Sequence, residues 1–530
     1  MSKSAMIAAV MAFERLRASA QVRNCKRMEG VNVMKRKQSK INRMSASLVA
    51  LFIVLFGVTG CTQEAGEHQA IELSDEQVEN IVRLSYPYVA MYNVNQKFAL
   101  DSNSPVWIGG WNEYKAPDGL LDHTVKAIAR PNNDTLYWTA MIDVRREPMI
   151  LEFPAYDSKY VSLMVTAYDH YVNIPLSTTK GDFAKPTRIL FYSERTPGYQ
   201  GDPVPGVDRV MELTGDFVSA VVRVMPHANE PARLQRNFKA FRESRLLTLS
   251  EHLDRDVAEI EFVPWQTPPG VERDLDVRQH AADFPPFGRT DFDIYGDNLL
   301  EVMQFVLNHT TFDPNDENDQ AVLAAYKPLG VEPGKAFDAR TVAQIDGQRF
   351  RTVAQSVAQH ELARMLELTS NKEDSLRIFL PKGEMDQDLL VFLSVVGPIG
   401  QPARETTYAP IATADGKPMN AMHDYVVRMD AKSLPPANAF WSLTLYDYER
   451  GFFIPNDFKK YSVGENAGMK LNAEGGIEIH VAAEKPDGVP PENWLPINRG
   501  DYGINTMMRI YAPDLERWKT WVPPQAERME

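Results

Sequence analysis

The sequence predicts a mixed α and β protein with more than one domain. Three stretches with different hydrophobic patterns support this class. Short β-rich runs separated by proline, glycine and asparagine occupy about residues 107–225, apolar residues at helical spacing occupy about 229–370, and β-rich runs return after about residue 389. The chain has 530 residues, of which 44% are hydrophobic, so two or three domains can each bury a core.

The N-terminal segment follows the pattern of a bacterial lipoprotein signal. Basic residues and then an apolar run occupy positions 35–58, and small residues lead from there to Cys61. Because the apolar run is shorter than the about 20 residues that cross a bilayer, we favour a cleaved signal over a transmembrane helix. We therefore expect residues 1–60 to be removed, with translation starting at Met1 or Met34. Acyl chains on Cys61 would then attach the protein to a membrane of the cell envelope.

The surroundings of the processed chain can be inferred from its charge and from the residue after the cysteine. Thr62, rather than aspartate, follows Cys61, which by resemblance to enterobacterial sorting rules favours the outer membrane, facing the periplasm, over the inner membrane. The net charge is −14, and removal of residues 1–60, with 11 Lys and Arg and 2 Asp and Glu, lowers it to −23. Such a surface repels nucleic acid and anionic headgroups, so we expect no nucleic-acid partner. The cysteines are Cys25 and Cys61, so the processed chain can form no internal disulfide.

A polar tether over residues 61–73 is followed by an N-terminal β domain, which we place at residues 74–226. It opens with a predicted helix, because Ser74 and Gln77 have the spacing of a capping box, and Pro87 is expected to end or kink this helix. Several short strands then indicate an antiparallel sandwich. The predicted strands cover 136–144, 149–153, 160–168, 188–192 and 217–225.

Helices are predicted to fill the middle of the chain, residues 227–388, and strands to form a C-terminal domain, residues 389–530. Apolar residues recur at helical spacing in the middle, whereas short β-rich runs and turn residues dominate the C-terminal part. The predicted helices cover 298–308, 319–326 and 341–368. The predicted C-terminal strands cover 389–396, 425–429, 439–446, 451–454, 477–482 and 504–511.

Several motifs give the chain a family resemblance. Residues 130–137 read Arg-Pro-Asn-Asn-Asp-Thr-Leu-Tyr, and residues 440–447 read Phe-Trp-Ser-Leu-Thr-Leu-Tyr-Asp. With 461–464, 492–496 and 509–511, they resemble the signatures of two paired bacterial domains of unknown function, catalogued as twelve fifty-four (N-terminal) and twelve fourteen (C-terminal). The likeness covers most of residues 80–525. It implies an immunoglobulin-like β-sandwich, a helical region and a jelly-roll-like β domain, and it implies no established reaction.

The first motif offers candidate ligand-binding and catalytic residues. Asn132, Asn133, Asp134 and Thr135 stand just before an apolar strand, where such side chains usually bond to nearby backbone in a turn. Four adjacent polar groups exceed the needs of one turn, so a second interpretation stays open. In it, Asp134 is a catalytic carboxylate and Arg130 clamps an anion. Tyr137 belongs to the same candidate site.

The second motif offers Asp447, and a later strand offers Arg509. Trp441 shares a strand face with Leu443 and Leu445, and we assign this face to the core. Asp447 stands where the chain turns, and it either caps that turn or acts as a second catalytic carboxylate facing a cleft. We favour a structural ion pair between Arg509 and Asp447 over the binding of a substrate acid by Arg509.

Motifs of the common enzyme classes and metal sites are missing from the sequence. It contains no Gly-x-Ser-x-Gly elbow, no glycine-rich phosphate loop, no dinucleotide fingerprint and no cysteine after Cys61. His360 opens a run that resembles a zinc-protease helix, but Arg364 replaces the second histidine, and we interpret the run as an exposed helix face. The acidic residues 313–319 lack the glycine and glutamate of a calcium loop and fit a helix start. We therefore expect no metal and no cofactor.

These observations lead to two hypotheses. The first is a lipid-anchored envelope protein in which a cleft between the β domains binds or hydrolyses a small or carbohydrate-like molecule. The second is a non-catalytic envelope scaffold, and the sequence leaves open whether the chain is an enzyme and what its oligomeric state is. Side chains of both motifs around one pocket would favour the first hypothesis. The residues of its site are Arg130, Asn132, Asn133, Tyr137 and Arg509 for binding, with Asp134 and Asp447 for catalysis.

Overall fold

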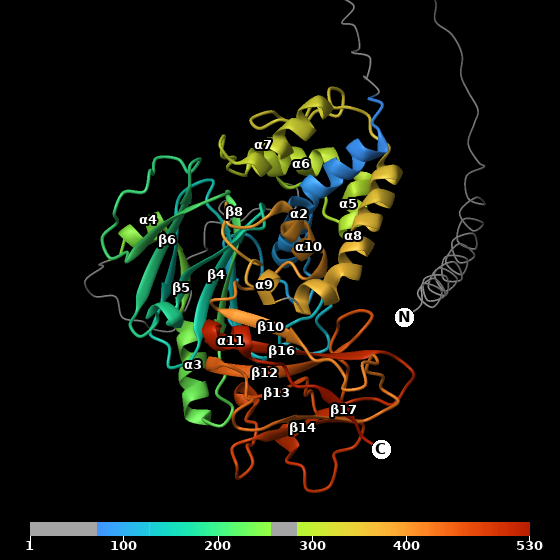
Figure 1. Cartoon of the computed structure of the whole chain (residues 1–530). Coiled ribbons are helices and arrows are strands. Elements are labelled where there is room, and N and C mark those ends of the chain that lie inside the picture. The colour runs from blue at the N-terminus through green and yellow to red at the C-terminus, as the bar shows by residue number, and fades with distance from the viewer. Residues whose placement is uncertain (1–70, 127, 256–282, 371) are drawn as a thin grey trace, which may run out of the picture. The chain divides into compact units, whose positions relative to one another are not determined.

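The computed structural model describes residues 71–530 except 127, 256–282 and 371 (Figure 1). The predicted signal segment and Cys61 lie outside the described residues. Residues 66–530 form one compact unit. The hydrophobic clusters of the described residues all draw their members from this unit.

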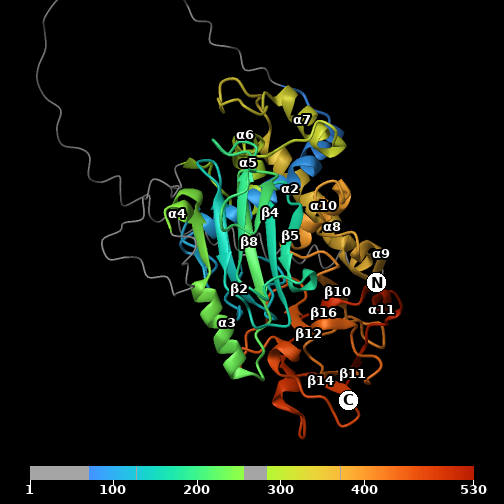
Figure 2. The ribbon, with the colours of Figure 1, turned by 90° about the vertical axis from the view of Figure 1, so that its left-hand side faces the viewer.

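Two β-sheets form the N-terminal sandwich. Their strands are β1 (Glu113–Lys115), β2 (Leu136–Asp143), β3 (Met149–Phe153), β4 (Val161–Ala167), β5 (Val172–Ser177), β6 (Thr187–Ser193), β7 (Arg209–Leu213), β8 (Phe217–Val224) and β9 (Arg245–Thr248). The first sheet has the order β1-β2-β8-β4-β5 and the second the order β7-β6-β3-β9. Figure 2 shows β2, β8, β4 and β5 side by side. Helices α3 (Pro231–Glu243) and α4 (Leu249–Leu253) flank the sandwich.

The first sheet is buried on both faces. On β8, Ala220 and Val222 point into the core between the two sheets, whereas Val221 and Arg223 alternate with them and point to the opposite face. All residues of β8 are buried, which explains its nearly continuous apolar sequence. The opposite face carries the side chains that reach the candidate site.

Helices cover much of this opposite face. Helix α2 (Asp75–Leu100) begins at Ser74, whose side chain accepts from the Gln77 N–H while the Gln77 side chain accepts from the Ser74 N–H, so the predicted capping box is confirmed. The helix does not end at Pro87, which lies inside it, and its apolar side chains cluster with Met141 of β2. No helix in the described part of the chain is long and apolar enough to span a bilayer. The other helices are α5 (Asp291–Asp297), α6 (Leu299–Asn308), α7 (Glu317–Tyr326), α8 (Gly347–Ser370), α9 (Lys372–Ser375) and α10 (Gln387–Val396).

Two four-stranded sheets form the C-terminal β domain. Their strands are β10 (Thr406–Pro410), β11 (Tyr425–Met429), β12 (Ala437–Asp447), β13 (Ser462–Gly464), β14 (Ile477–Ala482), β15 (Trp494–Pro496), β16 (Ile504–Pro513) and β17 (Ala526–Arg528). The sheet orders are β10-β16-β12-β13 and β15-β14-β11-β17. Trp441, Leu443 and Leu445 lie in the core of this domain, as predicted. Thr444 and Tyr446 alternate with them and contact residues of the N-terminal motif.

The predicted fold class is confirmed, with N-terminal sheets, a helical middle and C-terminal sheets, but two predicted strands are wrong. Residues 389–396 belong to helix α10, which packs against α2, α8 and the first sheet. A helix buried on several sides loses its 3.6-residue periodicity, so its apolar run resembles a buried strand. Residues 451–454 form no strand, because the chain is still completing the turn that starts at Asp447. The C-terminal strands therefore begin at Thr406.

Candidate functional site

Signature residues of both β domains meet around Asp134. This carboxylate stands just before β2 and is fully buried. It accepts hydrogen bonds from the hydroxyls of Tyr511 on β16 (3.1 Å) and Thr444 on β12 (3.2 Å), and Nη1 of Arg509 lies 3.7 Å away. A buried polar network therefore joins the first motif to the C-terminal sheet.

Arg509 supplies the positive charge of this network. Its guanidinium donates to Thr444 Oγ1 (3.1 Å) and to the backbone oxygen of Arg130 (3.3 Å), and it lies 5.6 Å from the centre of the Tyr446 ring. Burial acts to lower the pKa of Arg509, but Tyr446 and Asp134 more than offset this effect and raise the pKa above its ordinary value. The side chain therefore stays charged and paired.

The two asparagines of the first motif hold the same junction together. Asn132 Oδ1 accepts from the Asp134 N–H (2.6 Å), which is the bond of an Asx turn, and Asn132 Nδ2 donates to the Tyr511 hydroxyl (2.7 Å). Asn133 Oδ1 accepts from Ser462 Oγ on β13 (3.3 Å). These side chains thus form a local turn and also contact the C-terminal sheet.

Asp447 is not brought together with Asp134. It accepts from two backbone N–H groups of its own turn (3.0 Å each) and from Arg450 Nη2 (2.8 Å). Burial acts to raise the pKa of Asp447, but the bonds from Arg450 more than offset it and hold the pKa below its ordinary value. Thr444, which contacts Asp134, precedes Asp447 by three residues on β12, about 10 Å along the strand. The predicted Arg509–Asp447 ion pair is wrong, since Arg509 pairs with Asp134.

Arg130 has a left-handed backbone conformation beside Gly451. Its φ is +51°, and its N–H donates to the Gly451 oxygen at 2.7 Å. A Cβ on residue 451 would lie 3.3 Å from Arg130 Cγ, and the φ of Gly451 is +68°, so glycine permits this close approach. Arg130 Nη1 donates to the Val396 oxygen at the end of α10 (3.4 Å), while its Nε is buried without a partner in the described part of the chain. Burial lowers the pKa of Arg130.

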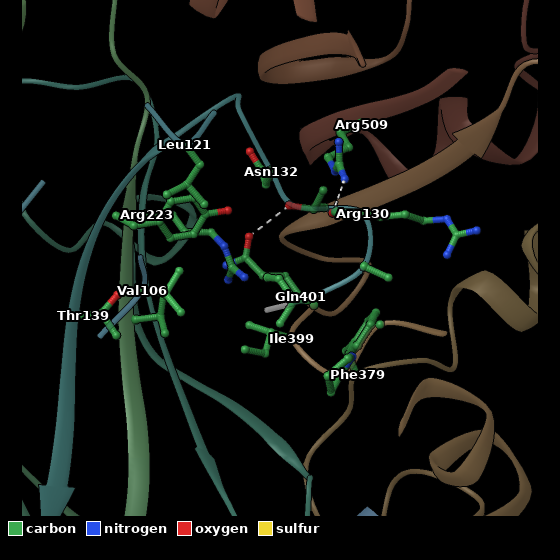
Figure 3. Close-up of a pocket in the computed structure, with 18 of the residues that line it drawn as sticks. Val106, Leu121, Arg130, Asn132, Thr139, Arg223, Phe379, Ile399, Gln401 and Arg509 are labelled. Carbon is green, nitrogen blue, oxygen red and sulfur yellow. Dashed lines mark hydrogen bonds between the residues drawn. The ribbon is translucent and has the colours of Figure 1, made fainter. Parts of the chain in front are cut away.

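A cavity of about 280 Å³ lies beside the polar network. The first N-terminal sheet, the end of α10 with the loop after it, strands β10 and β16, and loop residues between 105 and 132 surround it. Figure 3 shows Arg223 extending from β8, with Ile399 and Gln401 on the loop that follows α10. Much of the wall is apolar. Its apolar side chains include Val106, Leu121, Phe379, Phe392 and Ile399.

The cavity wall contains some of the predicted site residues and others that the sequence analysis missed. Asn133 and Asp134 lie behind the wall, in the polar network, and Asp447 lies in its own turn. The missed polar residues include Arg223, Gln401 and Tyr408. Arg223 had a signal in the sequence, because it is a lone cation inside the apolar run of β8. The predicted residues in the wall are Arg130, Asn132, Tyr137 and Arg509.

The described residues contain no group of three or more His, Cys, Asp or Glu side chains that could hold a metal ion. In the zinc-protease-like run, His360 is exposed but Glu361 is fully buried, between Arg83 (3.1 Å) and Arg364 (2.8 Å). The interpretation of this run as an exposed helix face is therefore wrong for Glu361. This carboxylate ties α8 to α2 through Arg83, while Arg364 pairs with it from within α8.

The fold defines a class of protein in which two β-sandwiches, with helices packed beside them, enclose a cavity lined by residues of both. Residues 111–245 match the family described as Protein of unknown function (DUF1254), and residues 405–515 match Protein of unknown function (DUF1214). The chain therefore carries both of the paired domains that its motifs predicted. No curated protein matches the chain.

Two solved structures resemble the chain. The crystal structure of the VPA0106 protein from Vibrio parahaemolyticus is 22% identical in sequence, with a TM-score of 0.60 over 86% of this chain and 99% of that chain. An uncharacterized protein from Burkholderia cenocepacia is 14% identical, with a TM-score of 0.37 over 86% of this chain and 93% of that chain. The first likeness shows that the fold is shared.

Proposed function

We propose that this chain is a lipid-anchored protein of the cell envelope that binds a small, largely apolar molecule in the cavity between its β domains. The cavity, about 280 Å³ in volume and bordered by both signature motifs, is the observation that carries this proposal. An apolar cavity of about 150 Å³ holds benzene, so by proportion this one has room for about 10 to 12 non-hydrogen atoms. Concave, mostly apolar sites with a few polar groups are typical of small-molecule binding.

Binding is better supported than hydrolysis or a purely structural role. Asp134 is occupied by Arg509, Tyr511 and Thr444 and lies behind the wall, so it is poorly placed for acid–base chemistry on an occupant. A scaffold would have no need for a cavity at the junction of its domains. The apolar walls also favour an apolar molecule over a carbohydrate, whose hydroxyls would need many polar partners.

The envelope location rests on the sequence around Cys61. The signal pattern supports export and acylation there, and the excess of acidic residues leaves the acyl chains as the means of membrane contact. Helix α2 begins at Asp75, so 13 residues, 62–74, separate this helix from the lipid-bearing Cys61. Such a length reaches at most about 50 Å, which would keep the cavity close to the membrane surface.

A thermal-shift screen of the chain from Gly66 onward tests the binding proposal. The panel contains neutral and charged molecules of about ten non-hydrogen atoms, and we expect at least one to raise the melting temperature. Val106→Trp fills the cavity from a half-buried loop position and should abolish that shift. Val522→Trp, at a position that is 76% exposed, is the matched control and should keep it. A panel without any shift, or a shift that survives Val106→Trp, would refute the proposal.

A further inference from the structure

Arg223 is a buried cation that no acidic side chain neutralises by direct contact. It lines the cavity and is 4% exposed. Across the described ranges, no carboxylate oxygen lies within 4.0 Å of its guanidinium. Its Nη1 contacts Met164 Sδ at 3.4 Å, its guanidinium carbon lies 5.5 Å from the centre of the Tyr137 ring, and it shares a side-chain hydrogen bond with Tyr137. A thioether and a neutral phenol are weak partners for a full positive charge.

A guanidinium stays protonated in proteins, so burial without an anion costs free energy that a bound anion would recover. We propose that the molecule bound in the cavity ends in a carboxylate and that Arg223 binds this carboxylate. This inference rests on the proposed function, and it specifies the ligand as an acid with an apolar body of about ten non-hydrogen atoms.

Two tyrosine hydroxyls beside Arg223 can donate hydrogen bonds to the same ligand carboxylate. Tyr137 faces Arg223 directly across the β2–β8 pair, and Tyr408 lines the cavity from β10. The Tyr408 oxygen accepts from the Gln401 N–H (3.1 Å), which leaves its own proton available to donate. Tyr137 shares a side-chain hydrogen bond with the Arg223 guanidinium, which can only donate, so within the described residues both phenols act as acceptors and keep their own protons free. A carboxylate at Arg223 could therefore accept from a guanidinium and from hydroxyl groups.

The charges of the site favour a singly charged group over a phosphate dianion. Arg509 is already paired with Asp134, so its charge is compensated. Figure 3 shows the guanidinium of Arg130 pointing away from Arg223, and Arg130 Nη1 donates to the Val396 oxygen. Among the arginines of the described cavity wall, Arg223 alone is neither paired with a carboxylate nor directed away in Figure 3, so this position matches one negative charge.

A competing explanation for Arg223 involves Glu405. This buried carboxylate accepts from the hydroxyls of Tyr160 (3.2 Å), Ser177 (2.7 Å) and Thr179 (2.7 Å), and it also attracts the Lys180 ammonium group electrostatically. If Glu405 balances Arg223 through Tyr160, Arg223 is a structural residue, and the charge of a ligand would not affect binding. Ligand preference therefore separates the two explanations.

Isothermal titration of the chain from Gly66 onward at pH 7 tests the inference with two probes of ten non-hydrogen atoms. Octanoate carries the charge, and octanamide has the same shape without it. We expect octanoate to bind at least tenfold more tightly than octanamide. Arg223→Met should reduce this preference to less than twofold, and Arg223→Lys should restore part of it. Arg130→Met, which removes a second cavity arginine whose guanidinium points away from Arg223, should affect both probes alike.

The outcomes separate this inference from the proposal on which it rests. Equal affinities for the two probes in the unaltered chain would overturn the inference and leave the binding site intact. A preference that survives Arg223→Met, or that Arg130→Met abolishes, would also overturn it. If Arg223→Met does not fold, the preference of the unaltered chain and its reduction in Arg223→Lys decide the question. Absence of binding by every molecule in the screen above would instead refute the proposed function.

Discussion

The buried ion pair between Asp134 and Arg509 allows a quantitative prediction. Asp134→Ala removes the acceptor of the Tyr511 and Thr444 hydroxyls and leaves the charge of Arg509, whose side chain is 6% exposed, without its carboxylate. Loss of one member of a buried ion pair costs about 3–5 kcal/mol, because the other charge stays buried and uncompensated. We expect the free energy of unfolding to fall by this amount.

Urea unfolding followed by tryptophan fluorescence measures this loss. Asp447→Ala is the matched control, since this carboxylate is 15% exposed and bonds within its own turn, and we expect it to cost about 0.5–1.5 kcal/mol. The double variant Asp134→Leu with Arg509→Met removes both charges and should recover most of the stability. The reasoning is refuted if Asp134→Ala costs less than about 1 kcal/mol, or if the double variant is no more stable than Asp134→Ala.

Three further predictions concern the lipid site and two neighbouring buried groups. Metabolic labelling with a fatty acid should mark the full chain but not the Cys61→Ser variant, and a labelled variant would contradict acylation at this residue. His170 bonds to Ser394 and to the Pro398 oxygen, and burial lowers its pKa from 6.5 to about 4. Its stabilising effect is therefore complete above pH 6.5 and lost as the pH falls toward 4, and His170→Gln should remove this acid sensitivity. Burial raises the pKa of Asp169 from 3.8 to about 6, so its contribution is favourable below pH 3.8 and lost as the pH rises through 6. Asp169→Asn should therefore be more stable than the unaltered chain at pH 8, by up to about 3 kcal/mol. Urea unfolding across pH 4–8 checks both residues, and curves parallel to that of the unaltered chain would contradict them.

Strands with one face in a core were predictable from the sequence, because their side chains alternate between two environments. On β12, the alternation that placed Trp441 in the core also placed Thr444 on the opposite face, and the structure has both. The strand pattern gives no information on which distant residue that face meets. Arg509 was therefore assigned to the wrong acid, since Asp134 lies 375 positions earlier in the chain.

In other parts of the chain, burial on several sides was the main obstacle to predicting the structure from the sequence. The sequence of α10 resembles that of a strand, because this helix is buried on several sides and its apolar residues show no helical periodicity. The sequence of β8 is an almost uniform apolar run, because both faces of this strand are buried. Arg223 could be recognised in that run as a single charged residue. Its role depends on the loop after α10 and on β10, and the sequence did not show that these segments lie beside it. The cavity is thus a property of the assembled domains, and no single segment of sequence encodes it.

Because both β domains contribute to the cavity wall, ligand binding depends on an unbroken chain. Tyr137 and Arg223 come from one β domain, and Tyr408 and Arg509 come from the other. A gene split between the two halves would yield two pieces, each with an open half-site and an unpaired member of the Asp134–Arg509 couple. Ligand binding would then require the two pieces to reassociate. The helical segment, which keeps both halves in one chain, therefore contributes to ligand binding.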